Sequence, residues 1–381
     1  MATETAEQMQ AKVLKSLEGT RYAAASLERL SGGVGNFLYR AQLVTPLDDG
    51  TAEVVVKHGE GYIARSPENS LTLDRCKVEE ECLKALSSFR VTGQQDSVKY
   101  VVRTPHCYFY DEKSNSQILE YLPNGIDLKN YALKNFAAPS PDSLKPQCHE
   151  LGRELAQWLV GFHRQSEQEA RAAREKGGKS ALFAQLEPCR EMQQLKHMIN
   201  YDWMVQRIAK FPDVLAEARE VFEEFKAAAL DELKGELMPI HGDFWTGNIV
   251  LANIAVEEGA EIPLFVIDWE MAQLGVRELD YGQMLAEMYQ LWLYKNIDAG
   301  LWMVQGFAEG LQLQSERVAF RTAAQLGCHL VAFGCVTPGW GTPEQGREVA
   351  RVGRDVIVNA RNGNREWFEK SELACLFSHV R

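Results

Sequence analysis

Asp243 and Asn248 are separated by four residues in the run His-Gly-Asp-Phe-Trp-Thr-Gly-Asn at 241–248. Phosphoryl transfer from a nucleotide requires a group that orients and deprotonates the acceptor hydroxyl, and it requires oxygen ligands for Mg²⁺. This spacing lets one loop present an Asp and an Asn to a single reaction centre. Asp268 follows an apolar, strand-like stretch and offers a hard carboxylate oxygen for a metal. An isolated Asp and Asn at this spacing is typical of a capped turn, but the three residues together favour phosphoryl transfer.

A glycine-rich run, Ser-Gly-Gly-Val-Gly-Asn at 31–36, lies between two strand-like segments. Glycines let backbone N–H groups approach phosphates, although this run alone could be any hairpin turn. Lys57 ends the next strand-like segment and is buried enough there to need a charged partner. Together these features predict a site for nucleotide phosphates. Its candidate contacts are Ser31, Gly32, Gly33, Asn36 and Lys57.

The partner of Lys57 is expected on the helix predicted at 74–88, which contains three consecutive glutamates at 79–81. Only one of the three can face inward. Glu79 lies four residues before Leu83 and therefore shares the apolar face of this helix. We expect Glu79 to pair with Lys57 and the other two glutamates to be solvated.

The segment Glu120-Tyr121-Leu122 ends an apolar strand-like stretch. It stands where the sheet-rich part of the chain gives way to the helical part, and backbone groups at such a hinge can pair with a nucleotide base. Glu120 and Leu122 are therefore candidate adenine contacts, and the alternative interpretation is a plain strand end.

Aromatic and acidic residues in the second half of the chain could contact the acceptor. The candidates are Trp203, Glu270, Tyr289, Trp292 and Trp340, together with Glu287 as a second acidic group. Most tryptophans in proteins are packing residues, so each aromatic candidate has a plain structural alternative. His163, in a helical stretch, is expected to be structural, because the histidines show no metal-ligand spacing.

The elements that must position these residues divide near residue 123. Before it, strand-like segments, including 100–102, surround one main helix at 74–88. From about residue 126 the pattern is mostly helical. This predicts an α+β chain, in which an antiparallel-sheet lobe at 1–122 binds nucleotide and a large helical lobe at 123–381 carries catalysis and substrate binding.

The composition excludes several classes of partner. The chain has 381 residues and a formal net charge of -12, which disfavours binding to nucleic acid. Its eight cysteines form no CxxC pair and predict reduced thiols in a cytoplasmic protein. The sequence contains no run of about 18 apolar residues, so no membrane span is expected. The first ten residues lack the apolar centre of a signal peptide. No obligate protein partner is expected.

The run at 240–249 resembles the catalytic motif of the aminoglycoside phosphotransferase and choline kinase superfamily. Val-Ile-Asp-Trp-Glu at 266–270 resembles its metal-binding motif. The resemblance extends over about residues 28–340. The layout is most similar to methylthioribose-kinase-like small-molecule kinases, a group that includes the hydroxytryptamine kinase of psilocybin biosynthesis. Membership implies a bilobal, protein-kinase-like fold but does not determine the substrate.

The resemblance also implies roles for individual residues. Asp243 becomes the catalytic base, and Asn248 and Asp268 become the Mg²⁺ ligands. His241 is expected to hold the loop in shape, and Asp280 is expected to brace it through backbone N–H groups. The glycine-rich run departs from the protein-kinase pattern Gly-x-Gly-x-x-Gly, which weakens its assignment.

The expected function is transfer of the γ-phosphate of Mg²⁺-ATP to a hydroxyl group of a small metabolite. The acidic composition and the spare aromatic residues favour a cationic or aromatic amine alcohol. A choline-like amino alcohol, an aminoglycoside and a methylthioribose-like thio-sugar stay open as acceptors. The alternative class is a pseudokinase-like protein that binds a nucleotide or metabolite without transfer.

Overall fold

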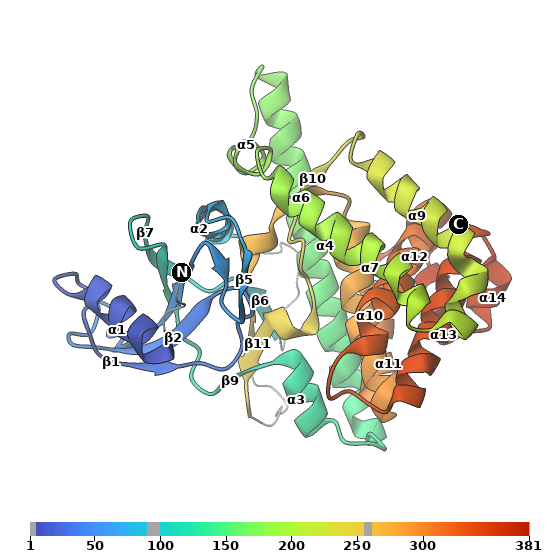
Figure 1. Ribbon diagram of the computed structural model, residues 1–381, viewed down its shortest axis with the longest axis horizontal. Coiled ribbons are helices and arrows are strands. Elements are labelled where there is room, and N and C mark those ends of the chain that lie inside the picture. Colours follow the sequence, from blue (N-terminus) through green and yellow to red (C-terminus); the bar gives the residue numbers. More distant parts are fainter. Residues whose placement is uncertain (1–4, 90–99, 255–260, 381) are drawn as a thin grey trace. The chain divides into compact units, whose positions relative to one another are not determined.

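The computed structural model describes residues 5–89, 100–254 and 261–380 (Figure 1). The chain divides into two compact units. The N-terminal unit comprises Met1–Phe89, Thr104–Asn124 and Ile267–Met271, and the C-terminal unit comprises Arg90–Arg103, Gly125–Val266 and Ala272–Arg381. The predicted division into a nucleotide-binding and a catalytic lobe concerns function and stays a prediction.

An antiparallel five-stranded sheet forms the centre of the N-terminal unit, in the order β1-β2-β3-β8-β7. Its strands are β1 (Ala24–Arg29), β2 (Phe37–Leu43), β3 (Glu53–His58), β7 (Cys107–Asp111) and β8 (Ser116–Glu120). A two-stranded hairpin, β4 (Tyr62–Ile63) and β5 (Ser66–Ser70), leads into helix α2 (Asp74–Leu86). The glycine-rich run therefore becomes the turn between β1 and β2, and Lys57 lies on the central strand β3.

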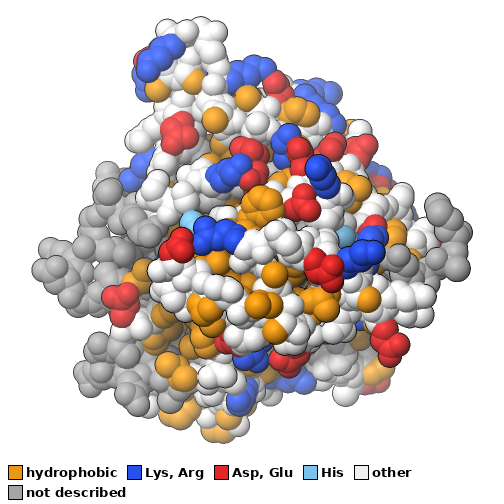
Figure 2. All heavy atoms as spheres, turned by 90° about the vertical axis from the view of Figure 1, so that its left-hand side faces the viewer, with side chains coloured by type: hydrophobic (Ala, Val, Ile, Leu, Met, Phe, Trp, Pro, Cys, Tyr) orange, Lys and Arg blue, Asp and Glu red, His pale blue; other side chains and the backbone are white. Residues whose placement is uncertain are grey.

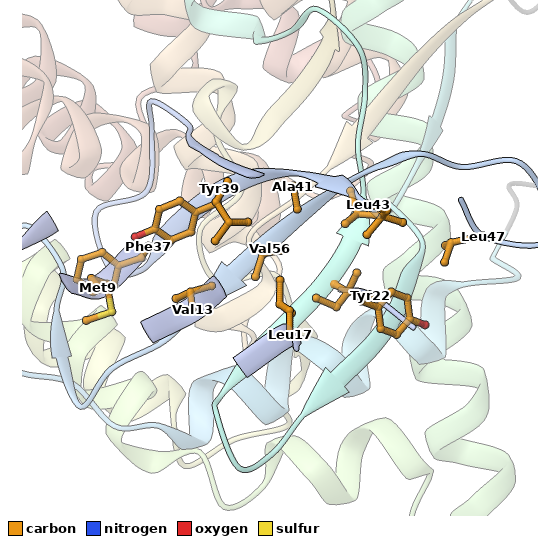
Figure 3. Packing of buried hydrophobic residues seen from close by; sticks show 13 residues of the cluster. Met9, Val13, Leu17, Tyr22, Phe37, Tyr39, Ala41, Leu43, Leu47 and Val56 are labelled. Carbon is orange, nitrogen blue, oxygen red and sulfur yellow. The ribbon is translucent and has the colours of Figure 1, made fainter. Parts of the chain in front are cut away.

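Helix α1 (Ala6–Leu17) covers one face of this sheet (Figure 3). Thr5 and Gln8 form a capping box that satisfies backbone N–H groups at its start. Met9, Val13 and Leu17 recur at helical spacing and are buried against the alternate residues of β2. Apolar residues that recur with the helical period in α1 thus pack against apolar residues that alternate along β2. This core supports the strands that carry the polar residues.

Long helices make up most of the C-terminal unit. Within it, α11 (Asp298–Leu311) packs along α4 (Lys145–Glu175), and α12 (Glu316–Ala332) packs against both α10 (Glu278–Lys295) and α13 (Pro343–Arg361) (Figure 1). The shorter helices are α3 (Leu128–Asn135), α5 (Ala181–Leu186), α6 (Arg190–His197), α7 (Trp203–Gln206), α8 (Pro212–Leu215), α9 (Arg219–Glu232) and α14 (Arg365–Glu369). The predicted α+β class, with a sheet-rich first part and a helical second part, is confirmed.

Two small sheets in the C-terminal unit hold the segment at 241–248. One pairs β10 (Met238–Ile240) with β13 (Gln273–Gly275). The other has the order β6-β12-β11-β9, from β6 (Tyr100–Arg103), β12 (Ile262–Val266), β11 (Ile249–Ala252) and β9 (Gly125–Asp127). The segment therefore leaves β10 and enters β11, so both of its ends are fixed by strand pairing.

The strand at 100–102 was expected in the N-terminal sheet, and that expectation is wrong. The structure pairs β6 in parallel with β12. The partner strand lies about 160 residues later in the chain, at Ile262–Val266. A local apolar pattern does not indicate which distant strand will complete the hydrogen bonding, so this pairing could not be read from the sequence.

The described part of the chain contains no helix long and apolar enough to cross a membrane. Figure 2 shows one face of the molecule, on which acidic and basic side chains are interspersed. On that face, the net negative charge is not gathered into a single acidic surface.

Candidate active site

The segment at 241–248 is held by a buried carboxylate. Asp280, on the first turn of α10, accepts hydrogen bonds from the backbone N–H groups of His241 and Gly242, both at 2.9 Å. Gly242 has a φ of 79°, in the left-handed region that a side chain would disfavour. Consecutive N–H groups can converge on one carboxylate here because glycine permits this turn.

Asp280 is fully buried and yet carries a charge. Burial alone would raise the pKa of this carboxyl, but hydrogen bonding and the proximity of His163 and His241 outweigh burial and hold the pKa below its usual range. His163 Nε2 lies 3.4 Å from Asp280 Oδ2, and its Nδ1 lies 3.3 Å from the hydroxyl of Tyr281. The geometry agrees with structural roles for His163 and Asp280.

Asp243 presents a partly exposed carboxylate, with 32% of its side chain accessible. Asn248 Nδ2 donates to the backbone oxygen of Asp243 at 2.9 Å and to its Oδ2 at 3.1 Å. Gln283 Nε2 donates to Oδ1 at 2.6 Å. Each carboxylate oxygen therefore accepts one hydrogen bond and keeps further lone-pair capacity, which a general base needs.

His241 is buried and has contacts that fit a packing role. Its Nδ1 accepts a hydrogen bond from the backbone N–H of Asp243 at 3.2 Å. Its ring meets Phe244 edge-on at 5.7 Å, and Phe244 in turn stacks on Trp158 of α4. These contacts anchor the loop on the longest helix of the unit.

The N-terminal unit holds a second polar cluster, centred on Lys57. Its ammonium lies 2.6 Å from Glu79 Oε2 and also contacts Asp268. Burial opposes the charge of Lys57, but the Asp268 and Glu79 carboxylates outweigh burial and raise the pKa of Lys57. Burial raises the pKa of Glu79, and Lys57 opposes that change. Helical spacing thus identified the partner of Lys57. The expectation that the other two glutamates are solvated is wrong for Glu80, which is buried and pairs with Lys84 one helical turn later. Glu81 is half-buried and lies 3.7 Å from Lys84 Nζ.

Asp268 has a φ of 66°, which is uncommon for a residue with a side chain. Such a conformation stores about 1–3 kcal/mol and persists where the surroundings determine it. The next residue, Trp269, is fully buried, and its N–H donates to Glu79 Oε1 at 3.1 Å. Strained residues cluster at functional sites, and the Asp268 carboxylate is directed at Lys57 here.

Glu270 was expected to face a cationic acceptor, but the structure buries it in a network within the N-terminal unit. Glu270 Oε2 accepts from Asn36 Nδ2 at 2.6 Å and from Arg75 Nε at 3.0 Å. Arg75 also donates to Asn36 Oδ1 at 3.0 Å and to the Gly35 carbonyl at 3.3 Å. The network ties the turn between β1 and β2 to helix α2. Sequence reasoning missed Arg75, although its position four residues before Glu79 was an available signal.

Within that turn, Gly33 has a φ of 53°, and a side chain there would approach the backbone oxygen of Asn36 to 2.9 Å. Asn36 is buried, whereas Ser31 and Gly32 are exposed. The glycine therefore permits a tight turn that is fixed at its C-terminal end by Asn36 and open at its start.

Glu270→Gln is expected to lower the free energy of unfolding by about 1–3 kcal/mol, because hydrogen bonds to a charged, buried group are replaced by neutral ones. Urea unfolding would measure it. The matched control is Glu112→Gln, whose side chain is 71% exposed and contacts Lys77, with an expected change below about 0.5 kcal/mol. Unchanged stability with a raised acceptor KM would instead restore the substrate-facing role of Glu270.

The predicted adenine segment lies at the end of β8. Glu120 N–H donates to the His106 carbonyl at 2.8 Å, and Glu120 Oε2 accepts from His106 N–H at 3.0 Å. Leu122 is half-buried just beyond the strand. The side chain and the N–H of Glu120 are therefore engaged within the N-terminal unit, and any contact with a base would use other backbone groups of this segment.

The four aromatic acceptor candidates lie in three separate ring pairs. Trp203 meets Phe333 at 5.3 Å, Tyr289 stacks on Trp292 at 5.6 Å, and Trp340 meets Tyr294 at 5.6 Å. Tyr289 and Trp340 are buried, whereas Trp203 and Trp292 are half-buried. The half-buried rings have free surface for a ligand, and the buried ones mainly pack.

Glu287 lies on α10, one helical turn after Gln283, which contacts Asp243. His329 Nε2 lies 2.7 Å from Glu287 Oε1. Burial would raise the pKa of Glu287, but the His329 hydrogen bond and the charges of His329 and Lys129 outweigh burial and hold it below its usual range. Among the described residues, Glu287 Oε2 is buried without a hydrogen-bond partner.

The phosphotransferase enzyme family matches residues 44–310, about 70% of the chain, and the chain belongs to that family. It is 28% identical over 381 residues to the phosphotransferase FrzJ of Cladobotryum sp, covering 96% of each protein. It is 21% identical over 350 residues to the 4-hydroxytryptamine kinase of Psilocybe cubensis, covering 89% of each protein. The chain is therefore an enzyme with a kinase-type reaction, in which a phosphoryl group passes to a hydroxyl of a small molecule.

Solved structures of small-molecule kinases are also similar. A choline/ethanolamine kinase family protein from Mesorhizobium loti has a TM-score of 0.46 at 15% identity, covering 98% of each chain. A microcompartment-associated aminopropanol kinase has a TM-score of 0.47 at 13% identity, covering 95% of this chain and 98% of that one.

Proposed function

We propose that this enzyme transfers the γ-phosphate of Mg²⁺-ATP to the hydroxyl group of a small amine alcohol. The observation that carries the proposal is the partly exposed Asp243 carboxylate, hydrogen-bonded to Asn248 at 3.1 Å on a loop braced by Asp280. Asp243 orients the acceptor hydroxyl and takes its proton. Asn248 and Gln283 hold the carboxylate in one orientation while this occurs.

The donor set fits a magnesium ion. Asn248 uses its amide N–H group on Asp243, so its Oδ1 is the atom that would face a cation. Asp268 adds a carboxylate, and both are the hard oxygen ligands that Mg²⁺ prefers. When bound, the metal would neutralise charge on the transferred phosphate.

Nucleotide binding is assigned to the N-terminal unit. Ser31, Gly32, Gly33 and Asn36 form a turn whose backbone N–H groups suit phosphate oxygens, and Lys57 adds a charge held in place by Glu79. The segment from Glu120 to Leu122 is assigned to the adenine base. These roles, and the division between a nucleotide lobe at 1–122 and a catalytic lobe at 123–381, are parts of the proposal.

The amine in the acceptor is supported by Glu287. Glu287 is buried, and among the residues that the structure describes one of its carboxylate oxygens has no hydrogen-bond partner. An ammonium group would supply a donor together with the opposite charge. The half-buried Trp203 is linked to it through Phe333 and His329 and could contact the body of an aromatic amine. The similar protein from Psilocybe cubensis is named a 4-hydroxytryptamine kinase, and 4-hydroxytryptamine carries both a hydroxyl group and an amine.

The proposed setting is the cytoplasm, without an obligate protein partner. The eight cysteines form no disulfide with one another in the described structure, and burial raises the pKa of several, such as Cys148 and Cys328, to about 12. Inert thiols of this kind are compatible with a reducing compartment.

A coupled ADP-release assay with ATP and Mg²⁺ tests the function. The panel should contain hydroxylated aromatic amines, choline-like amino alcohols, thio-sugars, aminoglycosides, and a deaminated analogue of each amine. We expect turnover with amine alcohols, none after chelation of Mg²⁺, and a KM for amines at least about tenfold lower than for their deaminated analogues.

Glu287→Gln is the matched variant for this panel, because it removes the charge and keeps the size. It should raise the KM of amine acceptors about 10–100-fold and leave that of the deaminated analogues unchanged. Equal effects on both classes would remove Glu287 from acceptor recognition. Nucleotide binding without ADP release across the whole panel would favour a pseudokinase-like binding protein.

A further inference from the structure

Lys196, on α6, is a buried lysine beside the catalytic loop of the same unit. Only 4% of its side chain is exposed. Its ammonium donates to Gln283 Oε1 at 2.6 Å and lies 4.0 Å from Asp243 Oδ1. Gln283 Nε2 in turn donates to that same Asp243 oxygen at 2.6 Å. The three side chains therefore form a connected arrangement that ends on the proposed base.

The chemistry of these groups determines the direction of the hydrogen bonds. An ammonium can only donate, so it requires the oxygen of the Gln283 amide. With the amide oxygen turned towards Lys196, the amide NH₂ is turned towards Asp243, whose Oδ1 accepts its hydrogen bond. Without the lysine, the Gln283 amide would lose the partner that selects this orientation.

A buried ammonium requires a reason, because burial strongly disfavours its charge. Burial lowers the pKa of Lys196, and the Asp243 and Asp280 carboxylates oppose that change. An apolar residue of similar size could fill this space with little change in the free energy of unfolding, since a buried charge contributes little to stability. Its position beside Asp243 suggests a function that uses the charge.

We propose that Lys196 and Gln283 form a positioning pair that holds the Asp243 carboxylate in a single orientation for accepting the hydroxyl proton. The inference rests on the proposed role of Asp243 as the base. Lys196 acts through its hydrogen bond to Gln283, and it is a positioning residue rather than a catalytic one. Gln283 donates to Asp243 Oδ1 and Asn248 donates to Oδ2, so the orientation of the carboxylate is fixed at both of its oxygens.

Lys196→Met and Gln283→Leu test the pair by steady-state kinetics. Each is expected to lower kcat about 10–100-fold, since a small misplacement of a reacting group can lower the rate about 10²-fold. The KM for ATP should stay within about twofold of the native value, because the nucleotide contacts are assigned to residues of the N-terminal unit. The double variant should be little slower than either single variant, since both changes break one arrangement. Lys226→Met is the matched control, on a lysine with a 35% exposed side chain paired with Asp202, and should leave kcat unchanged.

Two further readouts separate positioning from a general structural role. The free energy of unfolding of Lys196→Met should fall by no more than about 1–3 kcal/mol, because the buried Gln283 amide oxygen loses its donor while the cost of burying an ammonium is removed. In an Asp243→Asn background, adding Lys196→Met should change the residual kcat less than about twofold. A fall in stability of more than about 5 kcal/mol, or a further tenfold loss of kcat in that background, would overturn the proposal.

The experiment also separates this inference from the proposed function. If Asp243→Asn retains native activity, the proposed base is wrong. If Asp243→Asn is inactive while Lys196→Met and Gln283→Leu keep native kcat, the base stands and the positioning pair is wrong.

Discussion

Asp243→Asn is expected to lower kcat by about 10²–10⁴-fold, the usual contribution of a positioned general base. The amide cannot take the acceptor proton, yet it is close in size to the carboxylate. In the structure the Asp243 oxygens accept from Asn248 and Gln283, and an Asn side chain can keep only one of these as an acceptor. The loop backbone should be preserved, because Asp280 and the neighbouring strands hold it.

Single-turnover phosphorylation and equilibrium ATP binding should be measured on the same preparation. ATP affinity is expected to change less than about threefold, because nucleotide contacts are assigned to other residues. Asp231→Asn makes the same chemical change on a 75% exposed side chain that contacts Lys234, and it should be fully active. Retention of native kcat in Asp243→Asn would remove this residue from the base role.

Asp280→Asn is expected to lower the free energy of unfolding by about 3 kcal/mol. The buried carboxylate accepts two backbone N–H groups and lies near His163, and an Asn can accept only with its single oxygen. Its NH₂ group would face a donor that it cannot satisfy. Catalysis should fall as well, since the loop carrying Asp243 would lose its brace.

Urea unfolding as a function of pH gives a second test of Asp280. Because the folded-state pKa of Asp280 is lowered, its stabilising contribution is fully present above the unfolded-state pKa. The contribution is lost as the pH falls through the folded-state pKa. The difference in stability between the native protein and Asp280→Asn should therefore shrink on acidification. A constant difference would show that Asp280 does not stabilise through its charge.

Several features of the site could be predicted because their causes are local. The partner of Lys57 followed from helical spacing, since residues four apart share a face and Glu79 shares that of Leu83. The brace at Asp280 was implied by the family resemblance, and its carboxylate accepts from the backbone N–H groups of His241 and Gly242. The α+β class followed from hydrophobic periodicity.

Other features depended on residues that are distant in sequence. Glu270 follows Asp268 closely and was expected to face a substrate, but Arg75, 195 positions earlier, holds it in a buried network. Strand β6 was expected in the nearer sheet and instead pairs with β12. For β6, no local signal identifies the distant partner strand. For Glu270, the position of Arg75 four residues before Glu79 indicates a shared face of the helix but does not identify Glu270 as the partner of Arg75.

The sequence by itself therefore determined the family, the class of reaction and the candidates Asp243, Asn248 and Asp268, because spacing within one loop or strand carries that information. The tertiary structure alone decided which carboxylates are held in buried networks and which remain accessible. It also placed Gln283 against Asp243, the proposed base, and Lys196 against Gln283, from two separate helices. The physical reason is that charge and hydrogen bonding act through space, so a side chain acquires its pKa and orientation only from neighbours that folding supplies.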